Sequence, residues 1–198
     1  MKWNILLNPF ERYSEKSLLV FGITFTLFGS AVAYLMKARF DGVFDMHLVE
    51  NISFIDPFLD NILNIFTLVL LFVLFGKSIN HKTRWIDILS VAIVARIPFY
   101  LLPLLNIGGV LEKSLEGLLN GMDFQDLNNP PAIEPSDLLI ILLFSGVSIL
   151  CLGWFIVLFW NGFKTATNAK GIKNVIFFII LLILAEVISK ILISIFNS

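Results

Sequence analysis

The fold of this chain depends above all on residues 85–108, which read WIDILSVAIVARIPFYLLPLLNIG. The stretch is mostly apolar and exceeds the roughly 20 residues that an α-helix needs to cross a bilayer. Arg96 lies near its middle, where a charged side chain is costly unless it faces protein or water. Pro98 and Pro103 remove two backbone donors, which a membrane helix tolerates only where neighbours satisfy the freed carbonyl groups. These features predict an interior helix with other helices packed around it.

Composition is typical of a polytopic membrane protein. Hydrophobic residues make up 58% of the 198 residues and charged residues only 15%, with a mean hydropathy of +0.89. A soluble domain averages nearer half apolar and a quarter charged. The net charge of −1 shows no basic excess of the kind that indicates nucleic-acid binding, so no nucleic acid is expected among the partners.

The apolar residues fall into five blocks, which predict an all-α membrane protein with a single domain over residues 1–198. The predicted spans cover about 17–38, 57–76, 85–108, 137–160 and 175–196. Residues 1–16 are expected to lie against the membrane surface as a short lead-in rather than to bind a partner.

Small residues predict where two of the spans approach their neighbours closely. In the first span such residues recur at steps of four and three, at Gly22, Thr26, Gly29 and Ala33. In the fourth span Gly146 and Gly153 lie seven residues apart, which places them on one helix face. Both faces are interpreted as packing surfaces.

Basic residues predict the orientation in the membrane. With five spans, the N-terminus shares one side with loops 77–85 and 161–174. That side holds nine basic residues: Lys2, Arg12, Lys16, Lys77, Lys82, Arg84, Lys164, Lys170 and Lys173. The opposite side holds three: Lys37, Arg39 and Lys113. Because basic loops stay in the cytoplasm, the N-terminus is expected to be cytoplasmic and the C-terminus outside.

The outer loops under this topology are 39–56 and 109–136, and both are acidic. The first contains the chain's one cluster of carboxylates with a histidine, at Asp41, Asp45, His47 and Glu50. One histidine among scattered carboxylates makes a poor metal site, so a solvated surface loop is the favoured interpretation. The second loop has apolar residues at helical spacing, which predict an interfacial helix over Leu111, Leu115, Leu118 and Met122.

The topology and four short motifs resemble the Yip1 family of integral membrane proteins. The motifs are Asn8-Pro9-Phe10, Gly76-Lys77, Ala95-Arg96-Ile97-Pro98 and Asn161-Gly162-Phe163-Lys164. The resemblance covers about residues 8–195. The richness in Phe, Ile, Asn and Lys and the short N-terminal segment look like those of a bacterial member. The resemblance therefore implies a location in the bacterial cytoplasmic (inner) membrane.

Eukaryotic relatives of this family act in vesicle trafficking and bind Rab GTPases through cytoplasmic regions. A bacterium has no Rab system, so this function does not carry over, and no residue here is assigned as a GTPase contact. The expected partners are membrane lipids, with a membrane protein or a second copy of the chain as alternatives.

The sequence predicts no enzyme, no cofactor and no metal site. It contains no Gly-rich phosphate loop, no His-Glu-x-x-His and no Gly-x-Ser-x-Gly motif. Both histidines, His47 and His81, lie in predicted loops, so the serines of the spans lack a histidine base at matching depth. Two functions remain: a non-enzymatic protein that binds or organises lipid or partner proteins, and a small transporter or channel.

The charges inside the spans form the candidate site. Arg96 lies about ten residues into the third span and Glu186 about eleven into the fifth, roughly 15–17 Å from the inner end of each. Opposite charges at one depth should pair, and Lys190 can share the Glu186 carboxylate or reach Asp60. We therefore predict a buried polar cluster of Arg96, Glu186, Lys190, Asp60, Asn64 and Tyr100. The cluster either holds helices in register, which is the favoured interpretation, or forms the pathway of a transporter.

Overall fold

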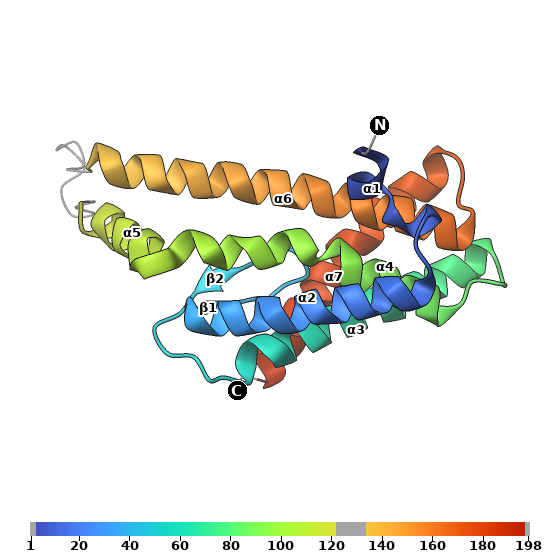
Figure 1. Ribbon diagram of the computed structural model, residues 1–198, viewed down its shortest axis with the longest axis horizontal. Helices are drawn as coiled ribbons and strands as arrows, with labels where there is room; N and C mark the ends of the chain where they lie inside the picture. Colours follow the sequence, from blue (N-terminus) through green and yellow to red (C-terminus); the bar gives the residue numbers. More distant parts are fainter. Residues whose placement is uncertain (1–2, 122–133, 197–198) are drawn as a thin grey trace.

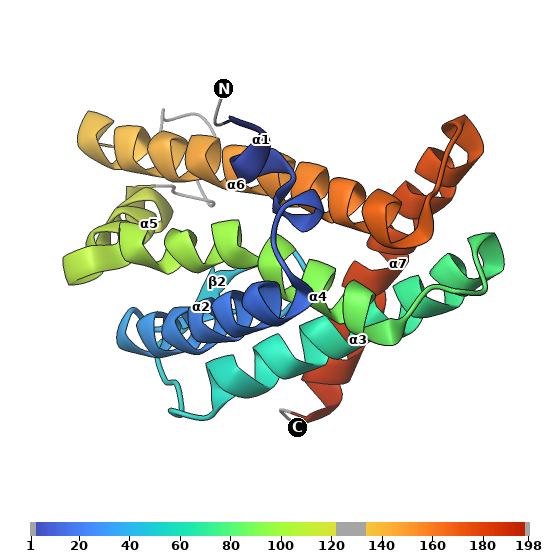
Figure 2. The same cartoon turned by 45° about the vertical axis from the view of Figure 1, so that its right-hand side comes forward.

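Five helical segments of the computed structural model, which describes residues 3–121 and 134–196, are long and apolar enough to cross a membrane. They are α2 (Glu15–Leu35), α3 (Asp56–Ile79), the stretch Trp85–Leu119, α6 (Pro135–Thr167) and α7 (Ile172–Phe196). In Figure 1, α2, α3 and α6 follow the long axis of the molecule, and Figure 2 shows α7 inclined to them. For the described residues, the predicted all-α class and five membrane-length helices are confirmed.

The third segment is a helix interrupted at Arg96. It begins as α4 (Trp85–Ala95) and continues as the 3₁₀ helix η2 (Ile97–Gly109). Because Pro98 and Pro103 lack the backbone N–H that an α-helix requires, the chain tightens into 3₁₀ turns beyond Arg96. In the most apolar part of this segment 72% of the residues are buried, so the predicted interior position is confirmed.

A glycine turn ends the interior helix. Gly108 and Gly109 adopt φ values of 72° and 71°, a left-handed conformation that glycine accepts without steric cost. The chain then enters α5 (Val110–Gly121), which supplies the helix predicted in this loop. Met122, the last residue of that predicted pattern, lies outside the described residues.

The small residues of α2 pack against the interior helix, as the sequence predicts. A Cβ atom at Gly22 would overlap Ile93 of α4, and one at Gly29 would overlap Tyr100 of η2. The two glycines therefore permit a close approach that any larger residue would prevent.

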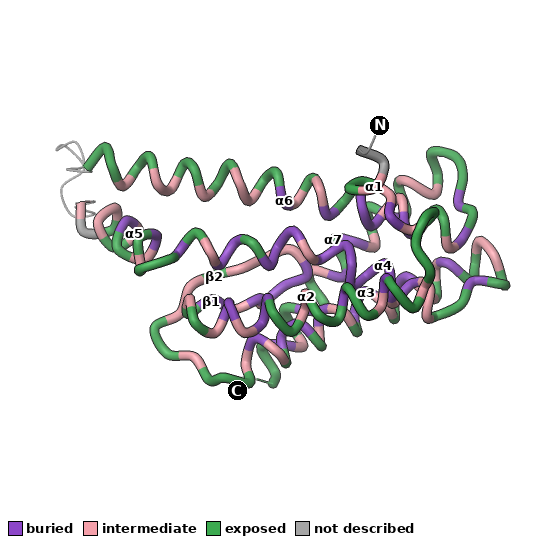
Figure 3. Tube along the Cα trace, in the orientation of Figure 1, coloured by how far each residue is buried: buried purple, intermediate pink, exposed green. Residues whose placement is uncertain are grey.

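The predicted packing face of α6 is wrong. A Cβ atom at Gly146 or Gly153 would meet nothing within 4 Å, and only 11% of the most apolar window of this helix is buried. The helix is about 50 Å long, and α5 lies along one side of its N-terminal half while the rest of that half is exposed (Figure 3). It also continues through Thr167, so the motif Asn161–Lys164 lies in the last turns of α6 rather than in a connector.

An aromatic cluster joins α3, α6 and α7. The ring of Phe72 lies 4.6 Å from that of Phe159, 5.5 Å from that of Phe163 and 5.3 Å from that of Phe178, measured between centroids. All four rings are buried. Edge-to-face aromatic pairs of this kind stabilise a core beyond the area that they bury.

The N-terminal residues lie across α6. They form α1 (Trp3–Leu7) and the short 3₁₀ helix η1 (Pro9–Glu11), and both views place α1 beside α6 (Figures 1 and 2). The indole Nε1 of Trp154 donates to the Leu6 carbonyl over 2.8 Å, and Asn161 Nδ2 donates to the Leu7 carbonyl over 2.9 Å. The lead-in is thus docked on the protein.

Residues 38–48 enter the helix bundle, and we call them the re-entrant segment. Two short antiparallel strands, β1 (Ala38–Arg39) and β2 (His47–Leu48), form its base. Between them Phe40 is 1% exposed and Val43 is 0% exposed. The predicted solvated surface loop is therefore wrong for this part of 39–56, because apolar side chains draw its tip into the core.

Candidate functional site

Arg96 is buried at the tip of the re-entrant segment. Its side chain is about 17 Å along α4 from Trp85, close to the middle of a hydrocarbon layer about 30 Å thick. The guanidinium donates to the Val43 carbonyl, to the Gly42 carbonyl over 3.5 Å and to Asn61 Oδ1 over 3.0 Å. It also lies 5.9 Å from the centre of the Phe40 ring. The charge of Arg96 is therefore stabilised by carbonyl dipoles and an aromatic face rather than by a carboxylate.

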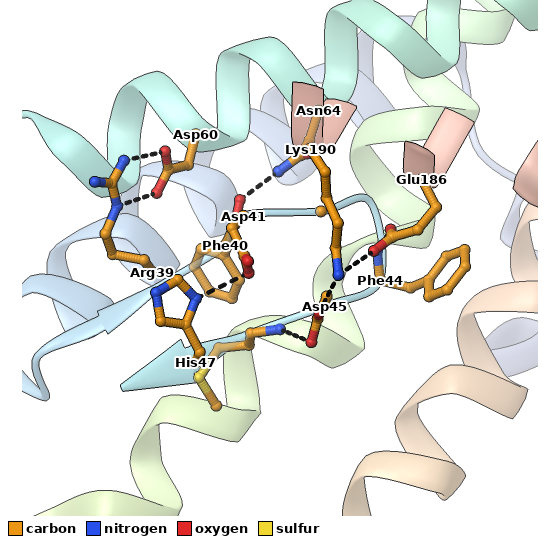
Figure 4. A network of polar contacts seen from close by, with 12 residues as sticks. Arg39, Phe40, Asp41, Phe44, Asp45, His47, Asp60, Asn64, Glu186 and Lys190 are labelled. Atoms are coloured by element: carbon orange, nitrogen blue, oxygen red, sulfur yellow. Dashed lines mark hydrogen bonds and ion pairs between the residues drawn. The ribbon is translucent and has the colours of Figure 1, made fainter. Parts of the chain in front are cut away.

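Two further side chains hold the backbone of the segment from other helices (Figure 4). Asn64 of α3 donates from Nδ2 to the Phe40 carbonyl over 2.7 Å, and Glu186 Oε2 of α7 accepts from the Phe44 N–H over 3.0 Å. The Glu186 carboxylate lies close over Gly42, so a Cβ atom at this position would force that side chain to shift. Non-helical backbone at membrane depth must be satisfied by protein, and these side chains do so.

Ion pairs fasten the outer part of the segment (Figure 4). Arg39 donates to Asp60 through Nε over 3.0 Å and Nη2 over 2.6 Å. Lys190 Nζ lies 2.5 Å from Asp45 Oδ2 and 3.3 Å from Glu186 Oε1. Bidentate arginine–carboxylate geometry gives the first of these pairs a fixed direction.

His47 and Asp41 form a titratable pair beside the strands. His47 Nδ1 lies 3.0 Å from Asp41 Oδ1. The pKa of His47 is raised above 6.5, chiefly because the Asp41 carboxylate accepts its hydrogen bond. Burial acts to raise the pKa of Asp41, but the hydrogen bond and charge of His47 outweigh it and lower that pKa below 3.8.

The predicted Arg96–Glu186 ion pair is not formed. Each side chain instead bonds to the backbone of the re-entrant segment, Arg96 to the Val43 carbonyl and Glu186 to the Phe44 N–H. Lys190 does share the Glu186 carboxylate as predicted, but its second partner is Asp45 and not Asp60. Tyr100 is buried and contacts Thr26 through a 3.1 Å hydrogen bond. Five of the six predicted residues thus form hydrogen bonds or ion pairs with the re-entrant segment. The sixth, Tyr100, packs edge-to-face on Phe40 of the segment, with 5.7 Å between the ring centroids.

The chemistry of this cluster is that of a clamp. Among residues 3–121 and 134–196, no three His, Cys, Asp or Glu side chains lie together in a way that could hold a metal ion. Each charged head in the cluster is bound to backbone or to an opposite charge, which suits it to fixing the segment.

A second site lies toward the N-terminal end of the bundle, where Phe10 and Tyr13 meet Arg84 of the α3–α4 turn and Gly162 near the end of α6. An apolar cavity of about 560 Å³, which we call the inner groove, lies among α1, α2, η2 and α6. Its walls include Leu6, Leu18, Phe21, Phe25, Leu101 and Trp154. The side chains of Trp154 and Asn161 donate to the carbonyls of Leu6 and Leu7 and so hold α1 in place over this groove.

A smaller polar cavity of about 280 Å³, the polar hollow, shares Tyr13 and Leu18 with the inner groove. Its charged residues are Glu15, Arg84 and Asp87, and Arg84 pairs with both carboxylates. Sequence reasoning missed this site. The available signal was an acidic residue in the first turn of two spans that begin on the same side.

Comparison with known proteins supplies no relative: no family model, no curated protein and no solved structure matches this chain. The resemblance to the Yip1 family therefore depends on the topology and short motifs alone. The features of the described residues that bear on function are the clamp around the re-entrant segment and the two adjoining cavities.

Proposed function

We propose that this protein is a non-enzymatic integral membrane protein of the Yip1 type that binds membrane phospholipid, with an acyl chain in the inner groove. The observation that carries the proposal is the groove itself, an apolar cavity of about 560 Å³ within the membrane-spanning part of the bundle. Ligand cavities of this size are ordinary for small molecules, and walls of aliphatic and aromatic side chains suit a hydrocarbon ligand.

The groove has the direction and opening that an acyl chain requires. Leu18, Phe21 and Phe25 follow one face of α2 from its N-terminal end toward the bilayer centre. Phe21 and Leu101 are each about half exposed, so the groove opens sideways toward the surrounding lipid. A lipid can therefore enter without leaving the bilayer, whereas a soluble ligand would have to cross the headgroups.

The proposed location is the bacterial cytoplasmic membrane, with the N-terminus in the cytoplasm. The nine basic residues against three support this orientation. The Arg84–Glu15 ion pair joins the N-terminal end of α2 to the α3–α4 turn. Thr167 at the end of α6 lies beside Gly76, where an added Cβ atom would be 3.0 Å from the Thr167 methyl group, so the same end of the bundle includes the end of α6. The inner groove then opens into the cytoplasmic leaflet.

The alternative of a transporter or channel draws less support from the buried charges. Arg96, Glu186 and Lys190 would have to exchange partners during transport. Arg96 and Glu186 instead hold buried backbone groups, and Lys190 joins two carboxylates. Because unsatisfied backbone groups in a membrane cost several kcal/mol each, these bonds favour a fixed role.

The test is to fill the groove and count bound lipid. Leu101→Trp places a larger side chain in the groove, while Leu105→Trp adds the same ring four residues along η2, at a residue that does not line it. Native mass spectrometry of delipidated protein with added phospholipid should show one retained lipid in wild type and Leu105→Trp. Loss of that lipid in Leu101→Trp supports the proposal, and an unchanged count or no retained lipid in any form contradicts it.

A further inference from the structure

The polar hollow lies where a phospholipid headgroup would be if an acyl chain occupied the inner groove. Tyr13 and Leu18 line both cavities, so the two adjoin and a headgroup in the polar hollow would lie next to a chain in the inner groove. Tyr13 and Trp85 are both about half exposed or more at this level, as aromatic residues are at a membrane interface. Glu15 lies ten residues before Phe25, a separation of about 15 Å along α2, which equals one leaflet of the hydrocarbon layer.

The charges of the hollow form an alternating row. Arg84 stands between Glu15 and Asp87, donating from Nη2 to both and from Nε to Asp87 over 3.0 Å. A guanidinium has five N–H groups, so the two on Nη1 remain open to a ligand among the contacts of the described residues. The Arg84 side chain is 60% exposed, which leaves it accessible. The three side chains together carry one net negative charge.

This row discriminates among headgroups by charge. A headgroup with a phosphate and no cation would gain Arg84 but lie beside two carboxylates. A headgroup with a phosphate and a primary ammonium satisfies both signs, because the phosphate accepts from Arg84 while the ammonium donates to Glu15 or Asp87. A quaternary ammonium has the same charge but no N–H to donate, so it lacks the hydrogen bond.

We propose that the polar hollow selects a zwitterionic phospholipid with a primary ammonium, namely phosphatidylethanolamine. This inference rests on the proposed lipid-binding function and adds the headgroup that the site prefers. Arg84 binds the phosphate, Glu15 and Asp87 bind the ammonium, and the inner groove holds an acyl chain.

The experiment is a competition among phosphatidylethanolamine, phosphatidylcholine and phosphatidylglycerol with identical acyl chains, read by native mass spectrometry of the delipidated full chain. Wild type should retain phosphatidylethanolamine about fivefold better than either competitor, as expected for partly exposed charge pairs. Glu15→Gln and Asp87→Asn keep the shapes of the side chains and should reduce this preference toward one. Glu11→Gln removes an exposed carboxylate that does not line the hollow and should leave the preference unchanged.

The outcomes separate the two proposals. A phosphatidylethanolamine preference that Glu15→Gln removes and Glu11→Gln keeps supports the headgroup assignment. Equal retention of all three lipids, or a preference that survives both hollow variants, overturns the headgroup assignment and leaves lipid binding standing. Retention of no lipid by wild type overturns the lipid-binding function as well.

Discussion

At the scale of single residues, Arg96 shows how a membrane protein buries a cation without a carboxylate partner. Its guanidinium ends on two backbone carbonyls, the Asn61 amide oxygen and the Phe40 ring. A carbonyl dipole costs less to bury than a carboxylate, and the re-entrant segment needs donors for its carbonyls in any case. The arginine and the segment therefore depend on each other.

The first prediction concerns Arg96→Met, which keeps much of the side-chain length and removes the donors. The buried carbonyls of Gly42 and Val43 lose their partner, so the free energy of unfolding in mild detergent should fall by about 2–5 kcal/mol. Arg12→Met removes an exposed arginine and serves as the control, with an expected change near zero. Equal effects from the two variants would show that the Arg96 bonds contribute little.

The second prediction concerns the coupling of Arg96 with Glu186. Both bind the backbone between Gly42 and Phe44. One substitution already loosens this backbone, so the second substitution should then cost less stability than it does alone. Thermal unfolding of Arg96→Leu, Glu186→Leu and the double variant should show a combined loss smaller than the sum by about 1 kcal/mol. Strictly additive losses would mean that the segment does not couple them.

At the scale of elements, Gly22 and Gly29 of α2 play the opposite part to Gly146 and Gly153 of α6, although each pair lies seven residues apart on one helix face. Those of α2 face α4 and η2 at close range, whereas Gly146 and Gly153 of α6 face open space. Spacing identifies a small-residue face, and only the arrangement of helices decides whether a neighbour uses it.

The third prediction compares Gly29→Ala with Gly146→Ala. At Gly29 the new methyl group overlaps Tyr100, so α2 must move away from η2, and the free energy of unfolding should fall by about 1–3 kcal/mol. At Gly146 the methyl group meets nothing within 4 Å, and alanine favours the helix by about 0.5–1 kcal/mol. Thermal unfolding in detergent measures both, and a destabilising Gly146→Ala would indicate an unseen packing partner for α6.

The fourth prediction concerns the pH dependence of the β1–β2 element. The pKa of His47 is raised above 6.5, so its pairing with Asp41 stabilises the fold fully below pH about 6.5 and ceases to do so as pH rises through the folded value. At acid pH, Asp41 continues to stabilise the fold until the pH falls through its folded pKa, which lies below 3.8. Asp41→Asn should therefore destabilise more at pH 6 than at pH 8.

NMR titration of His47 measures the same pair directly. Its pKa should lie above 6.5 in wild type and move back toward 6.5 in Asp41→Asn. A His47 titration that Asp41→Asn leaves unchanged would contradict the pairing.

At the scale of the whole molecule, the bundle has two different ends. The N-terminal end carries α1, the polar hollow and most of the basic loop residues, whereas the other end carries the re-entrant segment with its ion pairs. Because the two ends differ, the orientation in the membrane decides which leaflet the inner groove opens toward.

The fifth prediction is the orientation, with the basic loops in the cytoplasm. On a Cys151→Ala background, Glu50→Cys and Lys82→Cys place single thiols at exposed positions on opposite ends. A membrane-impermeant maleimide added to intact cells should label position 50 and not position 82, and both should react after permeabilisation. Labelling of position 82 alone in intact cells would show the opposite topology, with the inner groove in the outer leaflet.

The sequence by itself determined the membrane-length helices, the burial of the third segment and the close face of α2. Each of these follows from local composition or from a period along one helix: an apolar run must leave water, and Gly22 and Gly29 lie seven residues apart on the same face. The i, i+4 contact of Lys190 with Glu186 was predictable for the same reason.

Only the tertiary structure decided what Arg96 binds, where residues 38–48 lie and which helices enclose the inner groove. Arg96 meets Val43 across 53 positions in the chain, and Phe44 meets Glu186 across 142. Matching depth predicted that the two charges would find each other, but depth says nothing about a backbone segment that competes for them. A buried N–H or carbonyl outside a helix must find a partner wherever the packed helices provide one, and that choice is made in three dimensions.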